Sequence, residues 1–568
     1  MIRTRLKIVG QSGSGLLTAG ELVADSLKEL GYEICTDREY PSLIKGGTSC
    51  FTINFSDQPV RSLSKTADIL VAIDKPCLLE YFPTLKKEGI LVHGYERLAG
   101  IKEILDQAKQ KKIKVVACQA REIAEQSGGT VLMANIILTG LVWGVLGLDL
   151  KIMQNIVEKK FAKKFWLPIA IKCLQAGFAS VDKKESLVLP KPKPQPRIML
   201  DGNHALSLGA IHGGMRAYIA YPMSPASSIL THVAQMAKDT GVLVKQAEDE
   251  ITAAQMVVGA SFAGTRSMTA TSGGGYDLMT ETVSLAGIIE NPLVIVCVQR
   301  PGPATGLPTW TGQGDLNMVT YSAHGEFARI VLSVSDPTDA FDLIQHAFNL
   351  SEKYQTPVVV LSEKVIAESQ MTIPNFDLKK IKIERGLVTG KDLDKLESSD
   401  RYKITKNGIS LRWLPGSSGP HYFANGDEHD EEGRIDETEE AGDMYAKRMR
   451  KVDTIKKELP EPEVFGSKKA KISFIGWGSS KGVMLDTIAN NKDVNYLHVT
   501  YLHPLRTEKI KKFMQENKNV HLIEGNYEGQ LGNKIEGETG QKFKGKLLKW
   551  NGRQFFTEDV EEYIKKSN

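Results

Sequence analysis

Proline stands at every second position from Pro190 to Pro196, and this short segment limits what the chain can fold into more than any other. Proline lacks a backbone N–H and fixes φ, so a run at this spacing forms neither a helix nor an interior strand and favours a stiff, extended spacer. We therefore predict a linker at 186–198, which separates a domain at 1–185 from the rest of the chain.

The length of 568 residues is too great for one hydrophobic core, and a prior of about 150 residues per domain suggests three or four domains. After the linker we predict an α/β domain at 199–375, an irregular charged insertion or connector at 376–465 and a C-terminal α/β domain at 466–568. The net charge of +4 is small for this length, so we expect no nucleic-acid partner.

Two features bear on the compartment. The chain has six cysteines, none at C-x-x-C spacing, so we predict neither a zinc nor an iron–sulfur site here and expect a reducing, cytoplasmic location. The start of the chain runs directly into a strand, without the apolar core of a signal peptide.

The segment from Val131 to Leu148 lacks charge over about 18 residues, the lower limit for a membrane span, but Asn135, Thr139 and its glycines favour a buried helix. We expect no membrane partner.

The first domain reads as alternating strands and helices, which predicts an α/β fold with a mostly parallel sheet. A strand at Leu6–Val9 leads through the turn Gly10–Gly15 into an amphipathic helix at Leu16–Leu30. The turn opens a helix, as phosphate-binding turns do, but its spacing fits neither the dinucleotide fingerprint nor the P-loop, which favours a structural turn. Further strands are predicted at Cys50–Asn54, Ile69–Ile73, Ile90–Val92 and Val115–Cys118.

In the second domain, three predicted strands end in unusual loops: Tyr221–Ser228, Thr271–Tyr276 and Arg300–Thr311. The carboxyl ends of parallel strands meet at one edge of a sheet, where α/β proteins bind ligands, so we expect a site at this edge. The strands are predicted at Ala217–Ala220, Val242–Lys245, Ser267–Ala270, Leu293–Val298, Ile330–Leu332 and Val358–Leu361.

Glu248, Asp249 and Glu250 precede a helix rich in alanine and glycine. Acidic residues are common in a first helical turn because of the helix dipole, so three in a row indicate little by themselves. The small residues that follow indicate close packing, which would draw one carboxylate inside. A carboxylate held in a dry pocket is suited to general acid/base chemistry.

The connector at 376–465 contains an acidic stretch, Gly426–Gly433, and a basic one, Lys447–Lys451. We interpret it as a solvated insertion or a subunit contact. A metal site built on Asp427, His429 and Asp430 is the alternative, and we predict no metal on this chain.

Taken in order, these motifs resemble the α subunit of 2-oxoacid:ferredoxin oxidoreductases, in the form that carries the γ domain at its N-terminus. The resemblance covers nearly all of the chain. It implies three α/β parts: a γ-type domain, a pyrimidine-type domain that binds thiamine diphosphate, and a transketolase C-terminal-like domain. The matching segments are Tyr40–Gly47, Tyr221–Pro225, Glu250 with its helix, Gly302–Thr309, Gly476–Gly482 and Glu524–Leu531.

The resemblance implies an enzyme that decarboxylates a 2-oxoacid oxidatively with coenzyme A, giving acyl-CoA and CO₂ and passing electrons to ferredoxin. Glu250 and Ser224 would be catalytic, with Ser224 at a position where the family usually has threonine. The implied contacts are Tyr221, Pro222, Met223, Glu250, Ser272, Gly273 and Gly274 to the cofactor, Ser224, Thr309, Trp310 and His324 to substrate, and Lys45 to coenzyme A.

Two parts of such an enzyme are absent from this chain: a Gly-Asp-Gly…Asn segment for Mg²⁺ and diphosphate, and a cysteine cluster. In the split enzymes of this family both belong to a β subunit with a [4Fe–4S] cluster, which implies an αβ or (αβ)₂ assembly that shares the active site. The alternatives are a non-catalytic binding or scaffold module derived from the family, and a thiamine-dependent decarboxylase or transketolase-type enzyme that works alone.

The resemblance also bears on the substrate. Trp310 stands where many relatives that use 2-oxoglutarate carry lysine or arginine, and Ala323 stands where some carry arginine. A cation at these positions would pair with a distal carboxylate. Two neutral residues therefore favour an apolar or small 2-oxoacid, although His324 could still serve.

Overall fold

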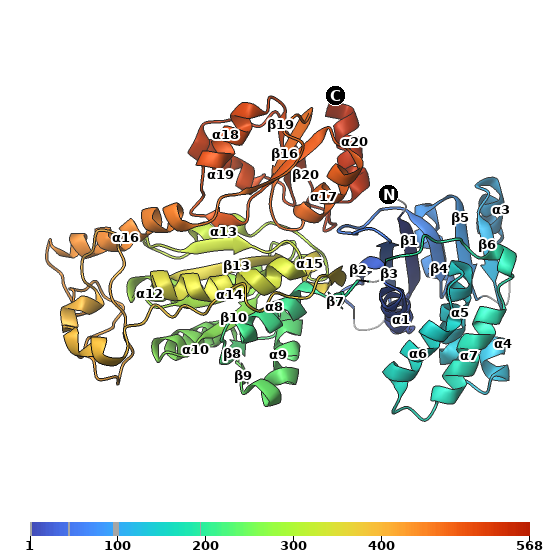
Figure 1. The fold of residues 1–568 in the computed structure, drawn as a ribbon, viewed down its shortest axis with the longest axis horizontal. Coiled ribbons are helices and arrows are strands. Elements are labelled where there is room, and N and C mark those ends of the chain that lie inside the picture. The colour runs from blue at the N-terminus through green and yellow to red at the C-terminus, as the bar shows by residue number, and fades with distance from the viewer. Residues whose placement is uncertain (1–2, 44–45, 95–100, 194, 568) are drawn as a thin grey trace. The chain divides into compact units, whose positions relative to one another are not determined.

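The computed structural model describes residues 3–43, 46–94, 101–193 and 195–567. The chain forms two compact units (Figure 1). Unit 1 comprises residues 1–200, 369–375 and 556–565, and unit 2 comprises residues 201–368 and 376–555 with the last three residues. Each unit is thus assembled from segments that are far apart in the sequence.

Unit 1 contains an eight-stranded sheet in the order β6-β5-β4-β1-β3-β2-β14-β7. The predicted strands are present, but the expectation of a mostly parallel sheet was wrong. β1 is parallel to β4 and antiparallel to β3, and β3 is antiparallel to β2, so half of the sheet is antiparallel. The strands are β1 (Thr4–Gln11), β2 (Glu33–Glu39), β3 (Thr48–Ser56), β4 (Ala67–Ala72), β5 (Leu85–His93), β6 (Lys114–Ala117), β7 (Ile198–Leu200) and β14 (Met371–Ile373).

β2 was not predicted, because its segment, Glu-Ile-Cys-Thr-Asp-Arg-Glu, is rich in charged residues. It is nevertheless an interior strand, since β14 covers its second edge, where the Thr372 hydroxyl accepts from the backbone N–H of Ile34 at 2.8 Å. The segment that covers β2 lies more than 330 residues away in the chain, and this separation conceals the pairing from any local pattern.

The apolar stretch beginning at Val131 forms a short 3-10 turn and then α5 (Ala134–Leu146), whose side chains from Ile136 onward are all buried. Within the described ranges, no single helix is long and apolar enough to span a membrane. Glycines let α5 approach α7 (Leu167–Ala179) backbone to backbone. A Cβ at Gly140 would lie 2.2 Å from the Leu174 carbonyl oxygen, and one at Gly177 would lie 2.0 Å from that of Ile137.

Unit 2 contains a seven-stranded sheet in the order β18-β12-β13-β11-β10-β8-β9, parallel except for β18. All six strands predicted for this region are present, to within two residues at each end. They are β8 (Ala217–Ala220), β9 (Leu243–Gln246), β10 (Ser267–Thr271), β11 (Leu293–Gln299), β12 (Ile330–Ser333) and β13 (Pro357–Glu363), and β18 is Tyr501–His503.

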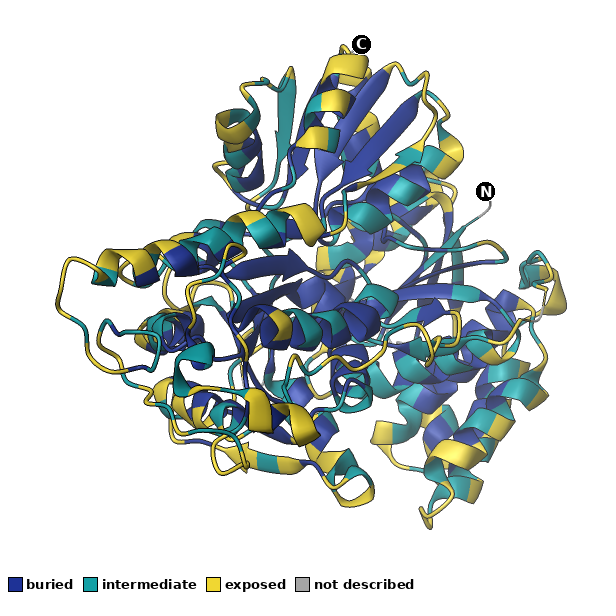
Figure 2. Ribbon diagram, turned by 60° about the vertical axis from the view of Figure 1, so that its left-hand side comes forward, coloured by how far each residue is buried: buried dark blue, intermediate teal, exposed yellow. Residues whose placement is uncertain are grey.

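Helices cover both faces of this sheet (Figure 1). One face carries α8 (Gly202–His212), α9 (Ser227–Thr240) and α14 (Pro337–Tyr354), and the other carries α10 (Glu250–Phe262) and α12 (Thr280–Ile288). The central strands β10, β11, β12 and β13 are buried on both sides (Figure 2), which explains the nearly continuous apolar sequences of β11, β12 and β13, whereas the edge strand β9 is mostly exposed.

A second sheet of unit 2 has the order β15-β17-β16-β19-β20 and shares its hydrophobic core with the first. Ile475, Trp477 and Leu497 from this sheet pack in the same cluster as Ile295 and Val359. The strands are β15 (Glu463–Gly466), β16 (Ile472–Gly476), β17 (Val494–His498), β19 (Val520–Glu524) and β20 (Gly545–Leu548), with helices α17 (Ser480–Asn490), α18 (Glu508–Glu516) and α19 (Gln530–Thr539).

The expectation of an irregular, solvated connector was wrong for its basic stretch, which lies within the 18-residue helix α16 (Ala441–Glu458). Lys447 and Lys451, one turn apart, are buried and both pair with the fully buried Glu290. The lysines therefore contribute to the core rather than to a solvated face, and the sequence separation of their partner hid this.

The acidic stretch is also ordered by internal contacts. Glu428 forms an ion pair with Arg448, and the buried His429 contacts the backbone carbonyls of Asp430 and Ile288. Among the described residues, no group of His, Cys, Asp and Glu side chains is arranged to hold a metal ion.

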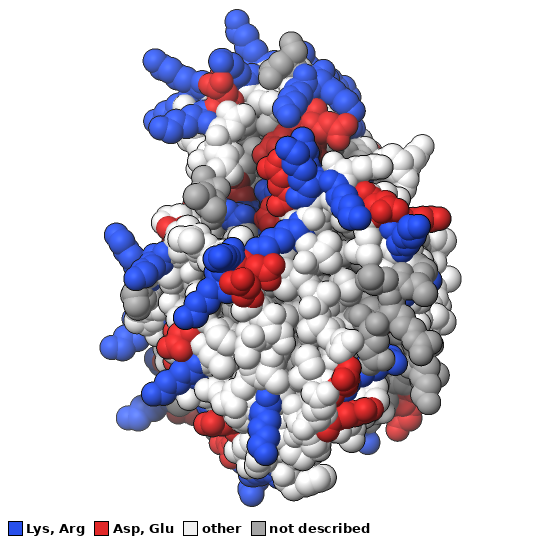
Figure 3. Space-filling model, turned by 90° about the vertical axis from the view of Figure 1, so that its right-hand side faces the viewer, with Lys and Arg blue, Asp and Glu red and all other residues white. Residues whose placement is uncertain are grey.

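On the face shown in Figure 3, lysine and arginine side chains are interspersed with carboxylates and uncharged surface.

Candidate active site

The unusual loops of unit 2 leave the carboxyl edge of the seven-stranded sheet, as the sequence predicts. β8, β10 and β11 are parallel and adjacent, and they end at Ala220, Thr271 and Gln299. Consequently the loops that start at Tyr221, Ser272 and Arg300 emerge side by side. The turn after β9 brings Glu250 to the same edge.

The structure selects Glu250 from the three acidic residues. Glu248 is exposed, while Asp249 caps α10 by accepting from the Thr252 backbone N–H at 2.7 Å. Glu250 is only 3% exposed, and its buried Oε1 has no hydrogen-bond partner in the described part of the chain. Burial raises the pKa of the Glu250 carboxyl, and the charge of Asp249 adds to this effect.

Three consecutive glycines make room for this carboxylate at the start of α11 (Gly273–Leu278). A Cβ at Gly275 would lie 2.6 Å from Glu250 Oε1 and 2.1 Å from Thr271 Oγ1, whereas a Cβ at Gly274 would meet no atom within 4 Å. Gly275 therefore makes room for Glu250, and Gly274 faces open space, as a ligand-binding position requires.

The Tyr221–Ser228 loop reaches the same place through Met223. The buried Ser272 hydroxyl donates to Met223 Sδ at 3.2 Å. Asn203 fixes the end of the loop, because its Nδ2 donates to the Pro225 carbonyl at 2.9 Å and to Ser228 Oγ at 2.8 Å. The helix that follows begins at Ser227 without a side-chain cap, so Ser228 lies in its first turn.

Ser224 is exposed at the edge of the site, and its backbone carbonyl accepts from Arg300 Nη1 at 2.6 Å. Arg300 was not among the residues that the sequence suggested, since a single arginine after a strand reads as the start of a loop. Its guanidinium carries five N–H donors, and within the described chain this is its one hydrogen bond. The remaining donors form a fork suited to a carboxylate.

Asp315 is a second residue that sequence analysis missed, because an aspartate before a helix reads as an ordinary cap. Burial raises its pKa to about 6, and the charge of Arg300 opposes this rise. Its buried Oδ2 has no hydrogen-bond partner among the described residues and lies 2.6 Å from the point where a Cβ on Gly273 would stand. Arg300 and Asp315 stand at the two ends of the loop that contains Thr309 and Trp310.

Thr309 is buried and Trp310 is half-buried. Although residue 310 is itself neutral, a cation lies against its side chain. The guanidinium carbon of Arg553 is 3.2 Å from the centroid of the Trp310 ring. The Thr311 backbone N–H donates to the Gly552 carbonyl at 3.2 Å, which fastens the two loops together. The sequence could not reveal this pairing, which spans more than 240 residues.

The structure does not bring His324 to this group. Its side chain is 78% exposed and pairs with Glu281 at 3.3 Å, and within the described residues it has no contact with Glu250 or Ser224. The proposed coenzyme A residue, Lys45, lies outside the described residues.

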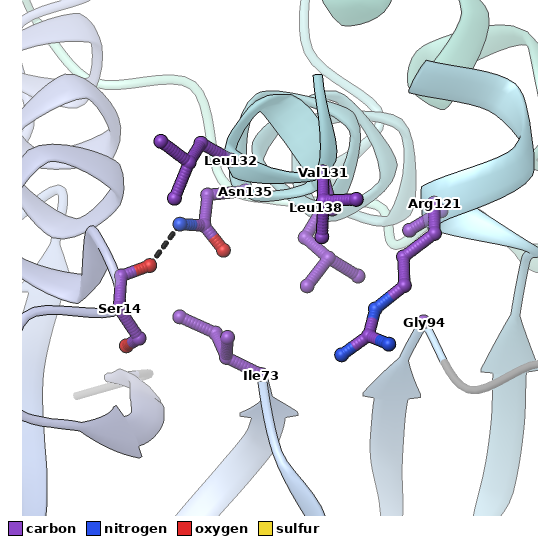
Figure 4. Close-up of a pocket in the computed structure, with 10 residues that line it drawn as sticks. Ser14, Ile73, Gly94, Arg121, Val131, Leu132, Asn135 and Leu138 are labelled. Carbon is purple, nitrogen blue, oxygen red and sulfur yellow. Dashed lines mark hydrogen bonds between the residues drawn. The ribbon is translucent and has the colours of Figure 1, made fainter. Parts of the chain in front are cut away.

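Unit 1 has a cavity of its own, of about 400 Å³, beside the Gly10–Gly15 turn (Figure 4). The Asn135 amide donates to the Ser14 carbonyl, and the buried Ser14 hydroxyl has no partner among the residues that the structure describes. Arg121 extends toward the cavity from α4 (Ala120–Gln126). Among the described residues that line it, the pocket therefore offers the Arg121 guanidinium and the Ser14 hydroxyl.

Comparison with known proteins matches a segment of unit 1 and a segment of unit 2 to the same class of oxidoreductase. A family described as pyruvate flavodoxin/ferredoxin oxidoreductase, thiamine diphosphate-binding, matches residues 208–447, and one described as pyruvate ferredoxin/flavodoxin oxidoreductase matches residues 5–180. The fold and the site thus define an oxidoreductase of the thiamine-binding class.

Relatives align over the whole chain. The 2-oxoacid:ferredoxin oxidoreductase subunit alpha of a Sulfolobus species is 34% identical over 98% of this chain and 96% of its own length. The 2-oxoglutarate oxidoreductase subunit KorA of Mycobacterium tuberculosis is 26% identical over 99% and 91%. A solved 2-oxoglutarate:ferredoxin oxidoreductase from Magnetococcus marinus, with 2-oxoglutarate, coenzyme A and succinyl-CoA bound, superposes with a TM-score of 0.92 at 29% identity over 100% of both chains. The chain belongs to the family of 2-oxoacid:ferredoxin oxidoreductase alpha subunits.

Proposed function

We propose that this chain is the α subunit of a 2-oxoacid:ferredoxin oxidoreductase, which converts a 2-oxoacid and coenzyme A to acyl-CoA and CO₂ and passes the electrons to ferredoxin. The observation that carries the proposal is the buried Glu250 carboxylate, whose Oε1 has no partner among the described residues. A buried acceptor left unpaired is costly unless a ligand satisfies it. The family to which the chain belongs indicates that this ligand is thiamine diphosphate.

The residues around Glu250 fit thiamine diphosphate. Glu250 would hold a proton against the aminopyrimidine ring nitrogen, because its raised pKa keeps the protonated form accessible. Ser272, Gly273 and Gly274 offer close backbone approach, and Tyr221, Pro222 and Met223 form the adjacent wall. When bound, the cofactor supplies a nucleophilic carbon and an electron sink for decarboxylation.

Substrate would bind beside this group, at the end of β11. Arg300 has the free donors to hold the carboxylate of a 2-oxoacid. Ser224 lies next to Arg300, because its backbone carbonyl accepts a hydrogen bond from the guanidinium. Thr309 and Trp310 would line the side-chain end of the substrate. Because Arg553 stacks on Trp310, the neutral residue at 310 no longer argues against an anionic substrate tail. We do not propose His324 as a substrate contact, because its exposed side chain pairs with Glu281 instead.

The remaining parts of the enzyme are proposed for other subunits. All six cysteines are free, and the described residues hold no metal-ligating group. A β subunit would contribute the Mg²⁺–diphosphate site and a [4Fe–4S] cluster, in an αβ or (αβ)₂ assembly that reduces ferredoxin. In unit 1, coenzyme A would be handled by Lys45 and by the pocket with Ser14 and Arg121. A cytoplasmic location remains an expectation from the sequence.

The test is co-purification of the complex from its native source, with assays for iron, thiamine diphosphate and ferredoxin reduction. We expect a smaller partner with both cofactors, and ferredoxin reduction that requires a 2-oxoacid and coenzyme A. A chain that purifies alone, without cofactor or activity, would contradict the proposal and favour the scaffold module.

A further inference from the structure

Gln313 lies near the end of the loop that carries Thr309 and Trp310, and its side chain is only 1% exposed. Thr309, Thr311 and Gln313 are buried, whereas Trp310 and Gly312 between them are half-buried. This alternation indicates an extended segment whose successive side chains point to opposite sides. Because such a segment is short and stiff, the position at which Gln313 is held bears directly on the position of Trp310.

Both ends of the Gln313 amide are bound to other loops of unit 2. Nε2 donates to Glu363 Oε1 at 2.7 Å and to the Trp477 carbonyl at 3.1 Å, and Oε1 accepts from the Gly525 backbone N–H at 2.6 Å. These partners lie at the ends of β13, β16 and β19. A buried amide satisfied in this way is fixed in place, because a shift would leave buried polar groups unpaired.

The backbone of Gln313 is fastened to the same part of the chain. Its N–H donates to the Gly525 carbonyl at 2.9 Å, and its carbonyl accepts from Asn526 Nδ2 at 2.9 Å. Two residues earlier, the hydrogen bond from the Thr311 N–H to the Gly552 carbonyl is longer, at 3.2 Å. Gln313 is thus held through its side chain and its backbone alike, and it is the principal anchor of this end of the loop.

Two glycines make room for this anchor. A Cβ at Gly525 would lie 3.1 Å from Gln313 Cγ, and one at Gly478, where φ is +57°, would lie 2.7 Å from Gln313 Nε2. These glycines belong to the segments Gly476–Gly482 and Glu524–Leu531, which support the family resemblance but supply no residue to the site described above. The packing gives both segments a role, which is to admit the side chain that anchors the substrate loop.

We propose that Gln313 is a positioning residue, which holds the segment Thr309–Gln313 where Thr309 and Trp310 discriminate between 2-oxoacids. The inference rests on the proposed function, because it takes Thr309 and Trp310 as contacts to the substrate side chain. Gln313 itself touches neither substrate nor cofactor in this arrangement. Its hydrogen bonds act through the loop, so the turns after β16 and β19 take part in substrate choice from behind the site.

The first test is Gln313→Met in the complete complex, since methionine is unbranched and similar in size but forms none of these hydrogen bonds. We expect the KM for the preferred 2-oxoacid to rise about tenfold with kcat within about threefold. The preference among pyruvate, 2-oxobutyrate and 2-oxoglutarate should narrow, while the KM for coenzyme A stays the same. Gln345→Met is the matched control: Gln345 is 3% exposed, and its amide bonds instead to the Phe341 carbonyl and to His212.

A second variant displaces Gln313 without removing a hydrogen-bonding group. In Gly525→Ala the new methyl group would stand 3.1 Å from Gln313 Cγ and Oε1, so the side chain must move by a few tenths of an ångström. We expect the same changes as in Gln313→Met, reduced to about threefold. Gly537→Ala, whose methyl group would meet no atom within 4 Å, is its control. This pair decides the question if Gln313→Met does not assemble.

Hydrogen exchange gives a readout that is independent of turnover. The backbone amides of residues 311 and 313 are bonded to other loops, and in the Gln313→Met complex they should exchange about tenfold faster than in wild type. The amides of α10, which carries Glu250, should keep their wild-type rates. Unchanged exchange at 311 and 313 would overturn the inference, because Gln313 would then not be the anchor.

The kinetic outcomes are equally decisive. Faster exchange with an unaltered KM and preference would overturn the inference, as would an equal rise in the KM for coenzyme A, which would indicate a general loss of structure. A wild-type complex that uses all three 2-oxoacids equally would also overturn it. A wild-type complex inactive on every 2-oxoacid would instead overturn the proposed function, and the exchange rates would still show whether Gln313 anchors the loop.

Discussion

Gly275 and Glu250 share one space: the carboxylate oxygen Oε1 lies 2.6 Å from the point where a side chain on residue 275 would begin. The two residues come from different strand ends, and each limits what the other can be. The buried Oε1, which has no hydrogen-bond partner among the described residues, fits here because the neighbouring residue has no side chain.

Glu250→Gln should lower ferredoxin reduction by the complex at least ~100-fold, because the amide cannot exchange a proton with the cofactor. The melting temperature of the chain should not fall, since the substitution removes a buried charge that has no partner. Glu248→Gln is the matched control: that residue is exposed, and its activity should equal wild type. Full turnover in Glu250→Gln would refute the catalytic assignment.

Gly275→Ala should destabilise unit 2 by about 1–3 kcal/mol, because the new methyl group must displace Thr271 Oγ1 and the Glu250 carboxylate. Gly274→Ala, one residue earlier in a helix and in open space, should keep or raise stability by ~0.5–1 kcal/mol. Chemical denaturation compares the two. If Gly274→Ala nonetheless raises the thiamine diphosphate concentration needed for activity, the open space belongs to the cofactor. Equal stability of the two variants would refute the close packing of Gly275.

Arg553→Gln should lower kcat/KM for 2-oxoglutarate about tenfold relative to that for pyruvate, if the cation on Trp310 meets the distal carboxylate. Lys544→Gln, an exposed cation on the same part of the chain, should leave the ratio unchanged. Trp310→Arg should raise the ratio by the same reasoning. The measurement is a panel of 2-oxoacids on each complex, and an unaltered ratio in both Arg553→Gln and Trp310→Arg would mean that this loop does not select substrate.

Glu290→Gln should destabilise the chain by ~3–5 kcal/mol, because it leaves Lys447 and Lys451 buried without a counter-charge. Burial by itself would raise the pKa of Glu290, but the two lysines outweigh it and hold the carboxylate ionised. The exposed pair of Lys395 and Asp392 gives the control, since Asp392→Asn should leave the melting temperature unchanged. A Glu290→Gln chain as stable as wild type would show that these lysines are neutral or solvated in the fold.

Glu363 predicts a pH dependence of stability. Burial raises the pKa of its carboxyl to about 7, while Ser479 and Gln313 donate to it. The fold therefore favours the protonated form, and the stability this group contributes is lost as the pH rises from about 4.5 through 7, by up to ~3 kcal/mol. Glu363→Gln should match wild type at pH about 5 and exceed it at pH about 8, by urea denaturation. Parallel curves would contradict the raised pKa.

Six strands of the seven-stranded sheet, and the burial of one carboxylate of the acidic run, followed from the sequence because each leaves a local signal, while the choice of Glu250 came from the family resemblance. Apolar runs between turn residues mark the strands, and small residues after an acid mark a closely packed helix. Arg300, Asp315 and Arg553 left no such signal. Each is an ordinary residue in its own loop and becomes part of the site only through a partner brought near by the fold.

The same limit applies to β2 and to the buried lysines of α16, whose charged segments read as surface. Their partners, β14 and Glu290, lie far away in the chain. Local pattern predicts which segments are apolar, but not which charged segment a distant carboxylate or strand will cover.

The return of residues 369–375 and 556–565 to unit 1 has a consequence for synthesis on the ribosome. A nascent chain that has reached Leu200 cannot yet complete the eight-stranded sheet, because β14, which joins β2 to β7, has not been made. The helix that contains Asp559, the partner of Lys65, comes last of all. The first unit to emerge is thus completed only after much of the second has been made, and the edge of β2 stays uncovered until β14 has been synthesised.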